Sequence, residues 1–365
     1  MENKRIAYLD MVKGIGIILV AAGHSGYLPH NVLTVITSFH MPLFFIVSGM
    51  LIRLTGEEHR PFRQLLSHKL KNFMLPYGIF SIVYLLIYGG YFHYISGSLT
   101  SRQIQEYIIQ AVSLDGISVL WFLSALFFAQ IFFLGIRKLF FLRKRTKIRK
   151  ISSIAVCMVT ALSACCLKPW FFGMLSAETL WEQWFMGVMY LLFRTAAGAG
   201  FLALGYVTME GLERLDSLEA SRKTGRQSGR ELAAGILCLV LTAFLSLYNG
   251  SCDLRYMQFH SLPVYLLCAY LGTMGIVFLC RGIPVWKWLC FLGANSLIIM
   301  LTHLDCQYML LSIRAGEFLA SLFPHAAEFL LYPGIILGMT GLELGTIYMV
   351  TLIRRILNRK HTGLS

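Results

Sequence analysis

Three ionisable residues interrupt the first long apolar stretch of the 365-residue chain. Asp10, Lys13 and His24 lie within or at the end of residues 6–24, a run long enough to cross a bilayer as a helix. Ionisable groups inside a membrane are costly, so they usually mark a functional site. An acid, a cation and an imidazole favour proton-transfer chemistry, with His24 as the natural base near neutral pH.

The spacing of these residues places them on one face of a helix. At about 100° per residue, Lys13 and His24 fall within about 20° of each other, and Asp10 lies within about 60° of both. About 21 Å of helix separates Asp10 from His24, so Asp10 is too far away to orient the imidazole. A simpler interpretation stays open, in which Asp10 and Lys13 form an i,i+3 ion pair and His24 only ends the helix.

The composition indicates that membrane helices must carry these residues. The chain is 57% hydrophobic and only 14% charged, with a mean hydropathy of +0.66, whereas a soluble domain has about 25% charged residues. The net charge of +14 would suggest nucleic acid in a soluble protein. Here we assign it to basic loops beside a lipid bilayer and expect no nucleic-acid partner. The nine cysteines show no CxxC or Cys/His spacing, so we expect neither a disulfide framework nor a metal site.

We predict an all-α fold, a single polytopic membrane domain over residues 1–365 with about ten transmembrane helices. The helices occupy roughly residues 6–353 and a basic tail follows at 354–365. The predicted segments are 6–24, 33–53, 73–95, 117–136, 151–167, 184–208, 232–250, 262–280, 289–310 and 329–353.

The loops between these segments alternate in basic charge. Most of the 32 Lys and Arg residues lie near the two ends of the chain and in every second loop, and the remaining loops hold few. Because cytoplasmic loops carry the excess of Lys and Arg, we predict that both termini are cytoplasmic. Asp10 and Lys13 then lie toward the cytoplasm and His24 toward the outside. The basic residues of the outer loops are Arg102, Lys168, Arg255 and Arg314.

Two further histidines fall at the predicted level of His24. His40 opens the second segment, which runs from outside to inside. His303 lies in the outer half of the ninth segment, seven residues after Ser296 and therefore on the same helix face. Chance placement of independent histidines is the alternative to a shared site.

Two unlike charges lie deep in other segments. Arg194 is about ten residues into the sixth segment, and Glu343 is at a comparable depth in the tenth. Buried charges usually pair, so we predict an Arg194–Glu343 ion pair. Lys13 is a competing partner for Glu343.

Several short motifs, taken in this order, resemble integral-membrane acyltransferase family 3, and especially its fucose 4-O-acetylase-like membrane O-acetyltransferases. The resemblance spans residues 5 to about 355. The motifs are Arg5-x4-Asp10-x2-Lys13-Gly14 with Gly23-His24, Phe39-His40-Met41-Pro42-Leu43-Phe44-Phe45 with Ser48-Gly49, Lys69-x-Lys71 with Leu75-Pro76-Tyr77, Leu120-Trp121-Phe122-Leu123, and Leu292-Gly293-x-Asn295-Ser296 with Thr302-His303.

The resemblance implies a multi-pass enzyme of the plasma membrane. It would move an acyl group, expected to be acetyl, from cytoplasmic acetyl-CoA to a hydroxyl of an extracytoplasmic carbohydrate or glycan. The implied catalytic base is His24. The implied supporting residues are Asp10, Lys13, His40, Ser296, His303 and Glu343, and the implied donor-binding residues are Arg53, Lys69, Lys71 and Trp121.

The basic pair departs from the family pattern, which usually has arginines at the positions of Lys69 and Lys71. Lysine keeps the charge but loses the bidentate fork of arginine. The residue that would orient His24 must come from another segment, and Glu343, Asp305 and Ser296 are the candidates. Two other function classes stay open, a transporter of a small polar solute and a non-catalytic scaffold. A carrier would form no ester product, and a scaffold would tolerate replacement of His24.

Overall fold

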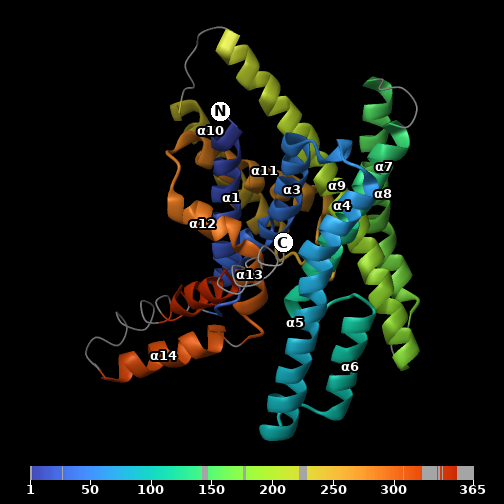
Figure 1. The fold of residues 1–365 in the computed structure, drawn as a ribbon, viewed down its shortest axis with the longest axis vertical. Helices are drawn as coiled ribbons and strands as arrows, with labels where there is room; N and C mark the ends of the chain where they lie inside the picture. The colour runs from blue at the N-terminus through green and yellow to red at the C-terminus, as the bar shows by residue number, and fades with distance from the viewer. Residues whose placement is uncertain are drawn as a thin grey trace, which may run out of the picture.

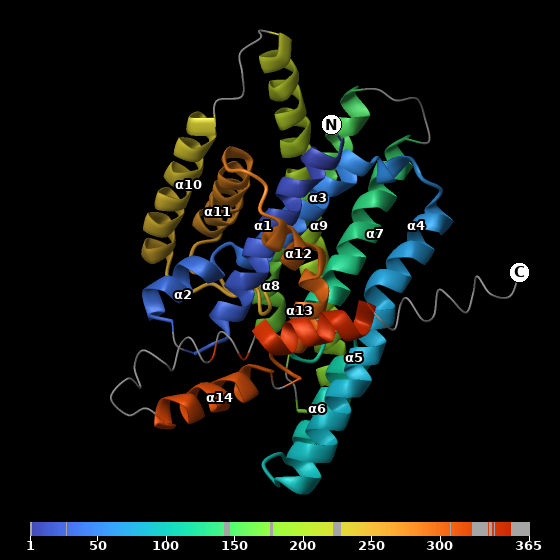
Figure 2. The ribbon, with the colours of Figure 1, turned by 60° about the vertical axis from the view of Figure 1, so that its left-hand side comes forward.

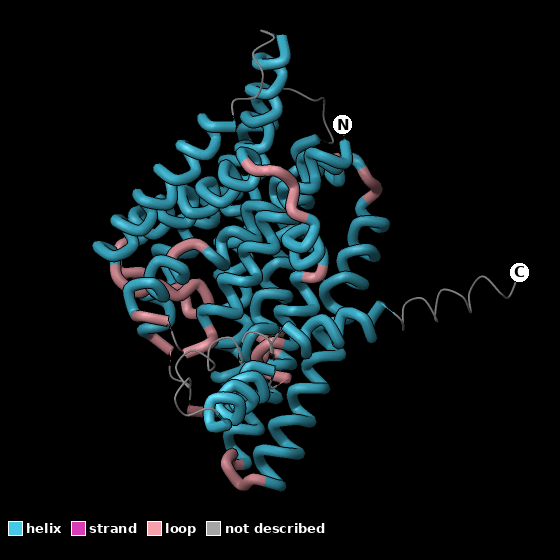
Figure 3. Tube along the Cα trace, turned by 90° about the vertical axis from the view of Figure 1, so that its left-hand side faces the viewer, coloured by secondary structure: helices cyan, strands magenta, loops and turns pink. Residues whose placement is uncertain are grey.

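The computed structural model describes residues 2–26, 28–141, 147–175, 178–221, 228–306, 308–322, 335, 338 and 340–351. These residues are almost entirely helical and contain no named strand (Figures 1 and 3). The α-helices are α1 (Glu2–Gly23), α2 (His30–Thr37), α3 (His40–Thr55), α4 (Phe62–Lys69), α5 (Leu75–Leu86), α6 (Ser101–Val112), α7 (Trp121–Phe141), α8 (Lys147–Gly173), α9 (Leu180–Ser221), α10 (Ser228–Asn249), α11 (Leu262–Gly282), α12 (Lys287–Ala294), α13 (Ser296–Thr302) and α14 (Tyr308–Leu322). Four short elements join them, the 3-10 turns η1 (Glu57–His59) and η4 (Ser118–Leu120) and the π-helical turns η2 (Leu70–Met74) and η3 (Ile87–Ile95).

The prediction of an all-α polytopic membrane fold is confirmed. Within the described residues, seven helical stretches are long and apolar enough to cross a membrane. They coincide with the second to eighth predicted segments. These spans are His30–Thr55, Phe62–Ile95, Ser118–Phe140, Ile151–Gly173, Leu180–Leu218, Ser228–Asn249 and Leu262–Gly282.

The remaining three predicted segments differ from this set. The first is the single helix α1, which is not among the seven. The ninth is divided at Asn295, whose side-chain amide donates to the Phe291 carbonyl at 2.8 Å and separates α12 from α13. Of the tenth, residues 335, 338 and 340–351 are described, and 340–351 lie crosswise beneath α13 (Figure 2). The count of ten crossings and the cytoplasmic termini stay predictions.

The spans divide into central and peripheral helices. In the spans that contain α3 and α7, 67% and 72% of the most apolar 18-residue stretch is buried. In the α4–α5 and α10 spans only 17% of that stretch is buried. Apolar side chains of the peripheral helices therefore face outward, as membrane helices require. The centre of the bundle is built by α1, α3, α7, α9 and α11, and the α5–α6 hairpin projects from one end (Figures 1 and 2).

Two glycines let α12 approach α1 unusually closely. A Cβ atom at Gly14 would stand 2.2 Å from the Leu289 carbonyl oxygen, and one at Gly293 would stand 1.8 Å from the Asp10 carbonyl oxygen. Neither position therefore accepts a larger residue without separating the helices. Small residues permit this kind of packing between membrane helices. The contact fixes the start of α13 beside the middle of α1, where Lys13 lies.

Candidate active site

His24 directly follows α1 and lines a pocket. Its backbone N–H continues the helix by donating to the Val20 and Ala21 carbonyls, both at 3.2 Å, while its side chain is exposed. The pocket, here called the His24 pocket, encloses about 860 Å³ including its open mouth. It is lined by Val20, Gly23, His24, Leu33, Thr37, His40, Met41, Ser118, Val119, Trp121, Cys252, Asp253, Leu254, Arg255, Tyr256 and Leu304.

Two histidines near His24 are held in a fixed tautomer by backbone carbonyls. The Nδ1 atom of His303 lies 2.9 Å from the Met300 carbonyl and 3.0 Å from that of Ile299, and His40 Nδ1 lies 2.9 Å from the Ile36 carbonyl. A carbonyl oxygen only accepts, so Nδ1 carries the hydrogen in both rings and Nε2 holds a lone pair.

His303 is the histidine that packs directly against His24. Their ring centroids are 5.4 Å apart, and His303 is completely buried. Its Nε2 atom has no hydrogen-bond partner among the described residues. That lone pair is therefore available to a ring N–H of His24, which would leave the other ring nitrogen of His24 to face the pocket.

A tight loop between α10 and α11 forms the far wall of the His24 pocket. The Asp253 carboxylate accepts the backbone N–H groups of Arg255 and Tyr256, at 2.6 and 3.3 Å, and this closes the turn. The Arg255 guanidinium lies 5.3 Å from the centre of the Tyr256 ring and makes no ion pair with a described residue. Cys252 is buried in the same loop, and burial raises the pKa of its thiol, which makes it a poor nucleophile at neutral pH.

A second pocket contains Lys69, one of the predicted donor-binding residues, together with Lys13. This Lys69 pocket encloses about 1210 Å³ including its opening. Lys69 is buried and its ammonium lies 2.7 Å from the Glu57 carboxylate, and Lys13 lies 2.7 Å from Asp10. The lining residues are Lys13, Ile17, Phe44, Ser48, Leu51, Ile52, Thr55, Glu57, Lys69, Asn72, Phe73, Phe122, Leu126, Gln130, Gly293, Ala294, Ser296, Leu297 and Met300.

The two pockets lie end to end along the same helices. On α1, Ile17 lines the Lys69 pocket and Val20, one turn later, lines the His24 pocket; α3, α7 and the α13 region divide in the same way. Phe44 and Phe122 meet edge to face, with centroids 5.8 Å apart, at the boundary between the two pockets. Lys13 and His24 are separated by about 16 Å of helix.

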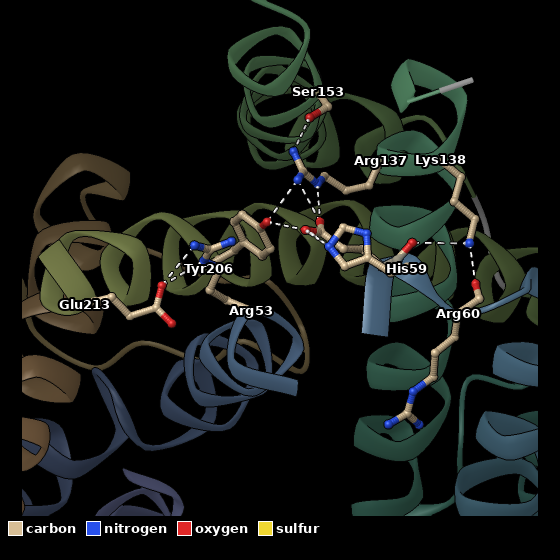
Figure 4. Close-up of polar contacts among 9 residues, drawn as sticks. Arg53, His59, Arg60, Arg137, Lys138, Ser153, Tyr206 and Glu213 are labelled. Atoms are coloured by element: carbon tan, nitrogen blue, oxygen red, sulfur yellow. Dashed lines mark hydrogen bonds and ion pairs between the residues drawn. The ribbon is translucent and has the colours of Figure 1, made fainter. Parts of the chain in front are cut away.

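A buried polar network supports the turn next to the Lys69 pocket (Figure 4). Arg137 donates to one Glu58 carboxylate oxygen from two nitrogens, at 2.9 and 2.6 Å, and the Tyr206 hydroxyl donates to the other at 2.6 Å. Another Arg137 nitrogen donates to Ser153 at 3.0 Å. The network therefore ties η1 to α7, α8 and α9, and it fixes Glu57, the residue next to Glu58 that binds Lys69.

Most of the predicted site residues separate into these two pockets. His24, His40 and Trp121 line the His24 pocket, with His303 behind it, whereas Lys13, Lys69 and Ser296 line the Lys69 pocket. Trp121 is a predicted donor-binding residue, but it lines the His24 pocket instead of the Lys69 pocket. Its ring also packs under the Arg194 guanidinium at 5.4 Å.

The other predicted donor-binding residues line neither pocket. Lys71 is exposed on η2. Arg53 donates to Glu213 at 3.0 Å and lies 5.7 Å from the centre of the Tyr206 ring, beside the network of Figure 4. Asp10 reaches the Lys69 pocket only through its ion pair with Lys13.

The predicted Arg194–Glu343 ion pair is wrong. Arg194 instead binds the Asp115 carboxylate at 2.6 Å and the Arg255 carbonyl at 2.5 Å. Asp115 follows α6 in a turn that packs on α9, which brings the carboxylate to Arg194. Glu343 accepts the Thr302 hydroxyl at 2.8 Å, and Lys13 is already paired with Asp10.

The three candidates for orienting His24 are engaged elsewhere. The Asp305 carboxylate accepts the Tyr88 hydroxyl, Glu343 binds Thr302, and Ser296 faces the Lys69 pocket. His303 is not among the three candidates that the sequence offers for this role, although its predicted position at the level of His24 is a usable signal. Glu58 and Arg137 could not be found from the sequence either, because a loop acid and a basic residue at a helix end indicate only the orientation in the membrane.

No group of three His, Cys, Asp or Glu side chains within the described ranges is arranged to hold a metal ion. The chain matches a family model described as an acyltransferase domain over residues 6–347. No curated protein and no solved structure matches it. The family match covers nearly the whole chain, including both pockets. The protein therefore belongs to acyltransferase family 3 and is a membrane-embedded transferase of acyl groups.

Proposed function

We propose that the protein transfers an acetyl group from acetyl-CoA to a hydroxyl of a carbohydrate at the outer face of the plasma membrane. One observation carries the proposal. Two pockets of different chemistry, one cationic and one lined by histidines, meet end to end on the same four structural elements. A transferase that joins two substrates from opposite sides of a membrane needs this arrangement.

The Lys69 pocket suits the anionic donor. Lys69 and Lys13 supply ammonium groups and Asn72 an amide, which are groups that bind phosphate oxygens. The deeper wall is apolar and aromatic, with Phe44, Phe73 and Phe122. In this proposal the nucleotide end of acetyl-CoA stays at the lysines. The pantetheine arm extends toward His24, and movement of Phe44 and Phe122 admits the thioester.

The His24 pocket suits the carbohydrate acceptor. Trp121 and Tyr256 offer flat ring faces, and Thr37, Ser118 and Asp253 offer polar groups for hydroxyls. A ring nitrogen of His24 removes the proton of the acceptor hydroxyl while its oxygen attacks the thioester carbonyl. The carbon–sulfur bond then breaks, the O-acetyl ester forms, and His24 returns the proton to the departing CoA thiolate.

The proposal is tested by acetyl transfer in proteoliposomes. [14C]Acetyl-CoA is supplied with carbohydrate extracted from the cell envelope, and label released by mild alkali is scored as ester. We expect His24→Gln to lower the rate by about 10²–10⁴, the usual contribution of general acid–base catalysis. His30→Gln is the matched control, because His30 is an exposed histidine outside both pockets.

Two outcomes would contradict the proposal. Folded His24→Gln protein with the wild-type rate would remove His24 as the base. Wild-type protein that carries the carbohydrate across the membrane without forming any ester would favour the transporter hypothesis instead.

A further inference from the structure

A third recess, separate from the two pockets of the proposed reaction, lies between α8 and α9. It is an apolar groove of about 520 Å³, including its open side. Residues at helical spacing on both helices form its walls, which makes it a channel along the helix axes rather than a round hole. Its main wall residues are Met158, Ala161, Cys165, Ala197, Phe201 and Leu204.

The groove opens toward the bilayer. Both helices are membrane spans, and Leu162 on its rim is 43% exposed although it lies within the apolar stretch of α8. Between Met158 and Cys165 the groove follows α8 for about 10 Å. A hydrocarbon chain from the surrounding lipid therefore fits its shape, its chemistry and its place in the fold.

One end of the groove carries a polar group without a partner. Tyr265 of α11 lines it, is 1% exposed and stacks on Phe259 with ring centroids 4.3 Å apart. Its hydroxyl makes no hydrogen bond with any described residue. An unpaired buried hydroxyl costs free energy unless a ligand supplies an acceptor. An oxygen atom at the head of a lipid chain would meet this requirement.

The same end of the groove adjoins the His24 pocket. Leu254 lines both recesses, and Arg255 beside it faces the His24 pocket. Lys168 lies one turn beyond Cys165 on α8, where its buried ammonium packs 5.5 Å and 5.7 Å from the centres of the Phe172 and Tyr190 rings. Like Arg255, it makes no ion pair with a residue that the structure describes. Two cations that make no ion pair with a described residue thus lie where the groove meets the His24 pocket.

We propose that the acceptor is a lipid-linked carbohydrate whose hydrocarbon chain lies in the α8–α9 groove. This inference rests on the proposed acetyl transfer and names its substrate class. The Tyr265 hydroxyl donates to an oxygen at the head of the chain, and Lys168 and Arg255 face an anionic linker such as a phosphate. The nearby Asp253 carboxylate is held by backbone N–H groups of its own loop. The sugar then reaches His24 from the same membrane face.

The lipid site is tested by photocrosslinking of the full-length protein in nanodiscs. The probe is a diazirine-bearing polyprenyl phosphate, and labelled peptides are identified by mass spectrometry. We expect label on α8 and α9 peptides that line the groove. Ala161→Phe fills the groove and should reduce this label by at least about fivefold, since overpacking a filled site is costly. Tyr265→Phe removes only the hydroxyl and should weaken labelling less.

Ala155→Phe is the matched control. Ala155 is an exposed alanine of the same helix outside the groove, so the substitution adds the same side chain without filling the site. Equal loss of label in the two variants would overturn the proposal. So would equal labelling by a diazirine-bearing phosphatidylglycerol that the polyprenyl phosphate fails to displace, because the groove would then hold ordinary bilayer lipid.

A second measurement separates this inference from the proposed function. Membranes are supplied with [14C]acetyl-CoA, and alkali-labile label is followed into lipid-extractable and water-soluble carbohydrate. We expect Ala161→Phe to reduce label in the lipid-extractable product by at least about fivefold and Ala155→Phe to leave it unchanged. Transfer only to soluble carbohydrate, at the wild-type rate in Ala161→Phe, would overturn the lipid-linked acceptor and leave the proposed function intact. No transfer by wild-type protein that still takes up the photoprobe would overturn the proposed function.

Discussion

The Lys69 pocket and the His24 pocket differ in the partners of their charged and titratable side chains. In the Lys69 pocket both lining lysines have acidic partners, Glu57 for Lys69 and Asp10 for Lys13. In the His24 pocket Arg255 makes no ion pair with a described residue, and the bonded nitrogens of His40 and His303 face backbone carbonyls. One pocket is thus built from compensated charges and the other from imidazoles with a fixed tautomer.

The two arrangements suit two different tasks, the binding of an anion and the transfer of a proton. Paired lysines keep their charge and position when no ligand is bound, which offsets the cost of burying them. In the proposed reaction an anionic donor competes with Glu57 and Asp10 for the two ammonium groups, so the ion pairs affect the affinity for the donor. Imidazoles held at Nδ1 instead keep Nε2 ready to exchange a proton.

The largest effect is expected from Arg137→Met, which breaks the support of the Lys69 pocket. Removing the guanidinium leaves the buried Glu58 carboxylate with only the Tyr206 hydroxyl and the His59 ring beside it among the described residues, and breaking a buried ion pair in this way typically costs about 3–5 kcal/mol. The loss should appear as a lower unfolding midpoint in detergent. Because Glu58 anchors the turn that carries Glu57, we also expect a higher KM for acetyl-CoA.

Arg281→Met is the control for a broken buried ion pair. Arg281 binds Asp216 at 2.7 Å and Glu231 at 2.9 Å, and it lines neither pocket. It should lower stability to a similar degree and leave the KM for acetyl-CoA unchanged. An equal KM change in both variants would mean that the Arg137 network acts only through stability.

A smaller effect is expected from His303→Phe, which tests the fixed tautomer on the other side. Phenylalanine keeps a ring against His24 but removes the Nε2 acceptor. We expect kcat to fall about tenfold to a hundredfold, part of the usual general-base contribution, with little change in either KM. His93→Phe is the control, because His93 Nδ1 also binds a carbonyl, that of Leu99 at 2.6 Å, but lies outside both pockets. Unchanged kcat in His303→Phe would mean that His303 does not orient His24.

The sequence predicts the membrane spans and the separation of Lys13 from His24, but it does not predict which distant side chains pair. Hydropathy located seven of the spans, and charge spacing on the first segment separated Lys13 from His24, because both signals are local and periodic. Pairings between distant segments were not predictable in this way. Arg194 binds Asp115 and Arg137 binds Glu58 across 79 residues, and packing alone decides which charges meet.

The break of the ninth segment was also not predictable from hydropathy. Residues 288–294 and 297–301, on either side of Asn295 and Ser296, are apolar, so hydropathy predicts one continuous helix. Gly293 packs closely against Asp10, and the side-chain amide of Asn295 donates a hydrogen bond to the Phe291 carbonyl. Together these two contacts end α12 there. The separate helix α13 is what brings Ser296 to one pocket and His303 to His24.

Lys69→Gln should produce a moderate effect confined to the donor. Loss of one charge-assisted contact to a phosphate is expected to raise the KM for acetyl-CoA about tenfold, with kcat nearly unchanged. Lys71→Gln is the control, because Lys71 is exposed and lines neither pocket. The two KM values, measured at low and physiological salt, decide the point. Equal increases would mean that the lysines act through general surface charge.

The smallest effect is expected from Asp10→Asn, which releases Lys13 from its carboxylate. The Lys13 and Asp10 side chains are 23% and 26% exposed, and a partly exposed pair of this kind contributes about 0–1 kcal/mol. If Asp10 competes with the donor phosphates, the KM for acetyl-CoA should fall by up to about fivefold. Lys13→Gln should raise it, and the double variant should match Lys13→Gln alone, because no ammonium is left to release. A KM that rises in Asp10→Asn would show instead that the carboxylate positions Lys13 for the donor.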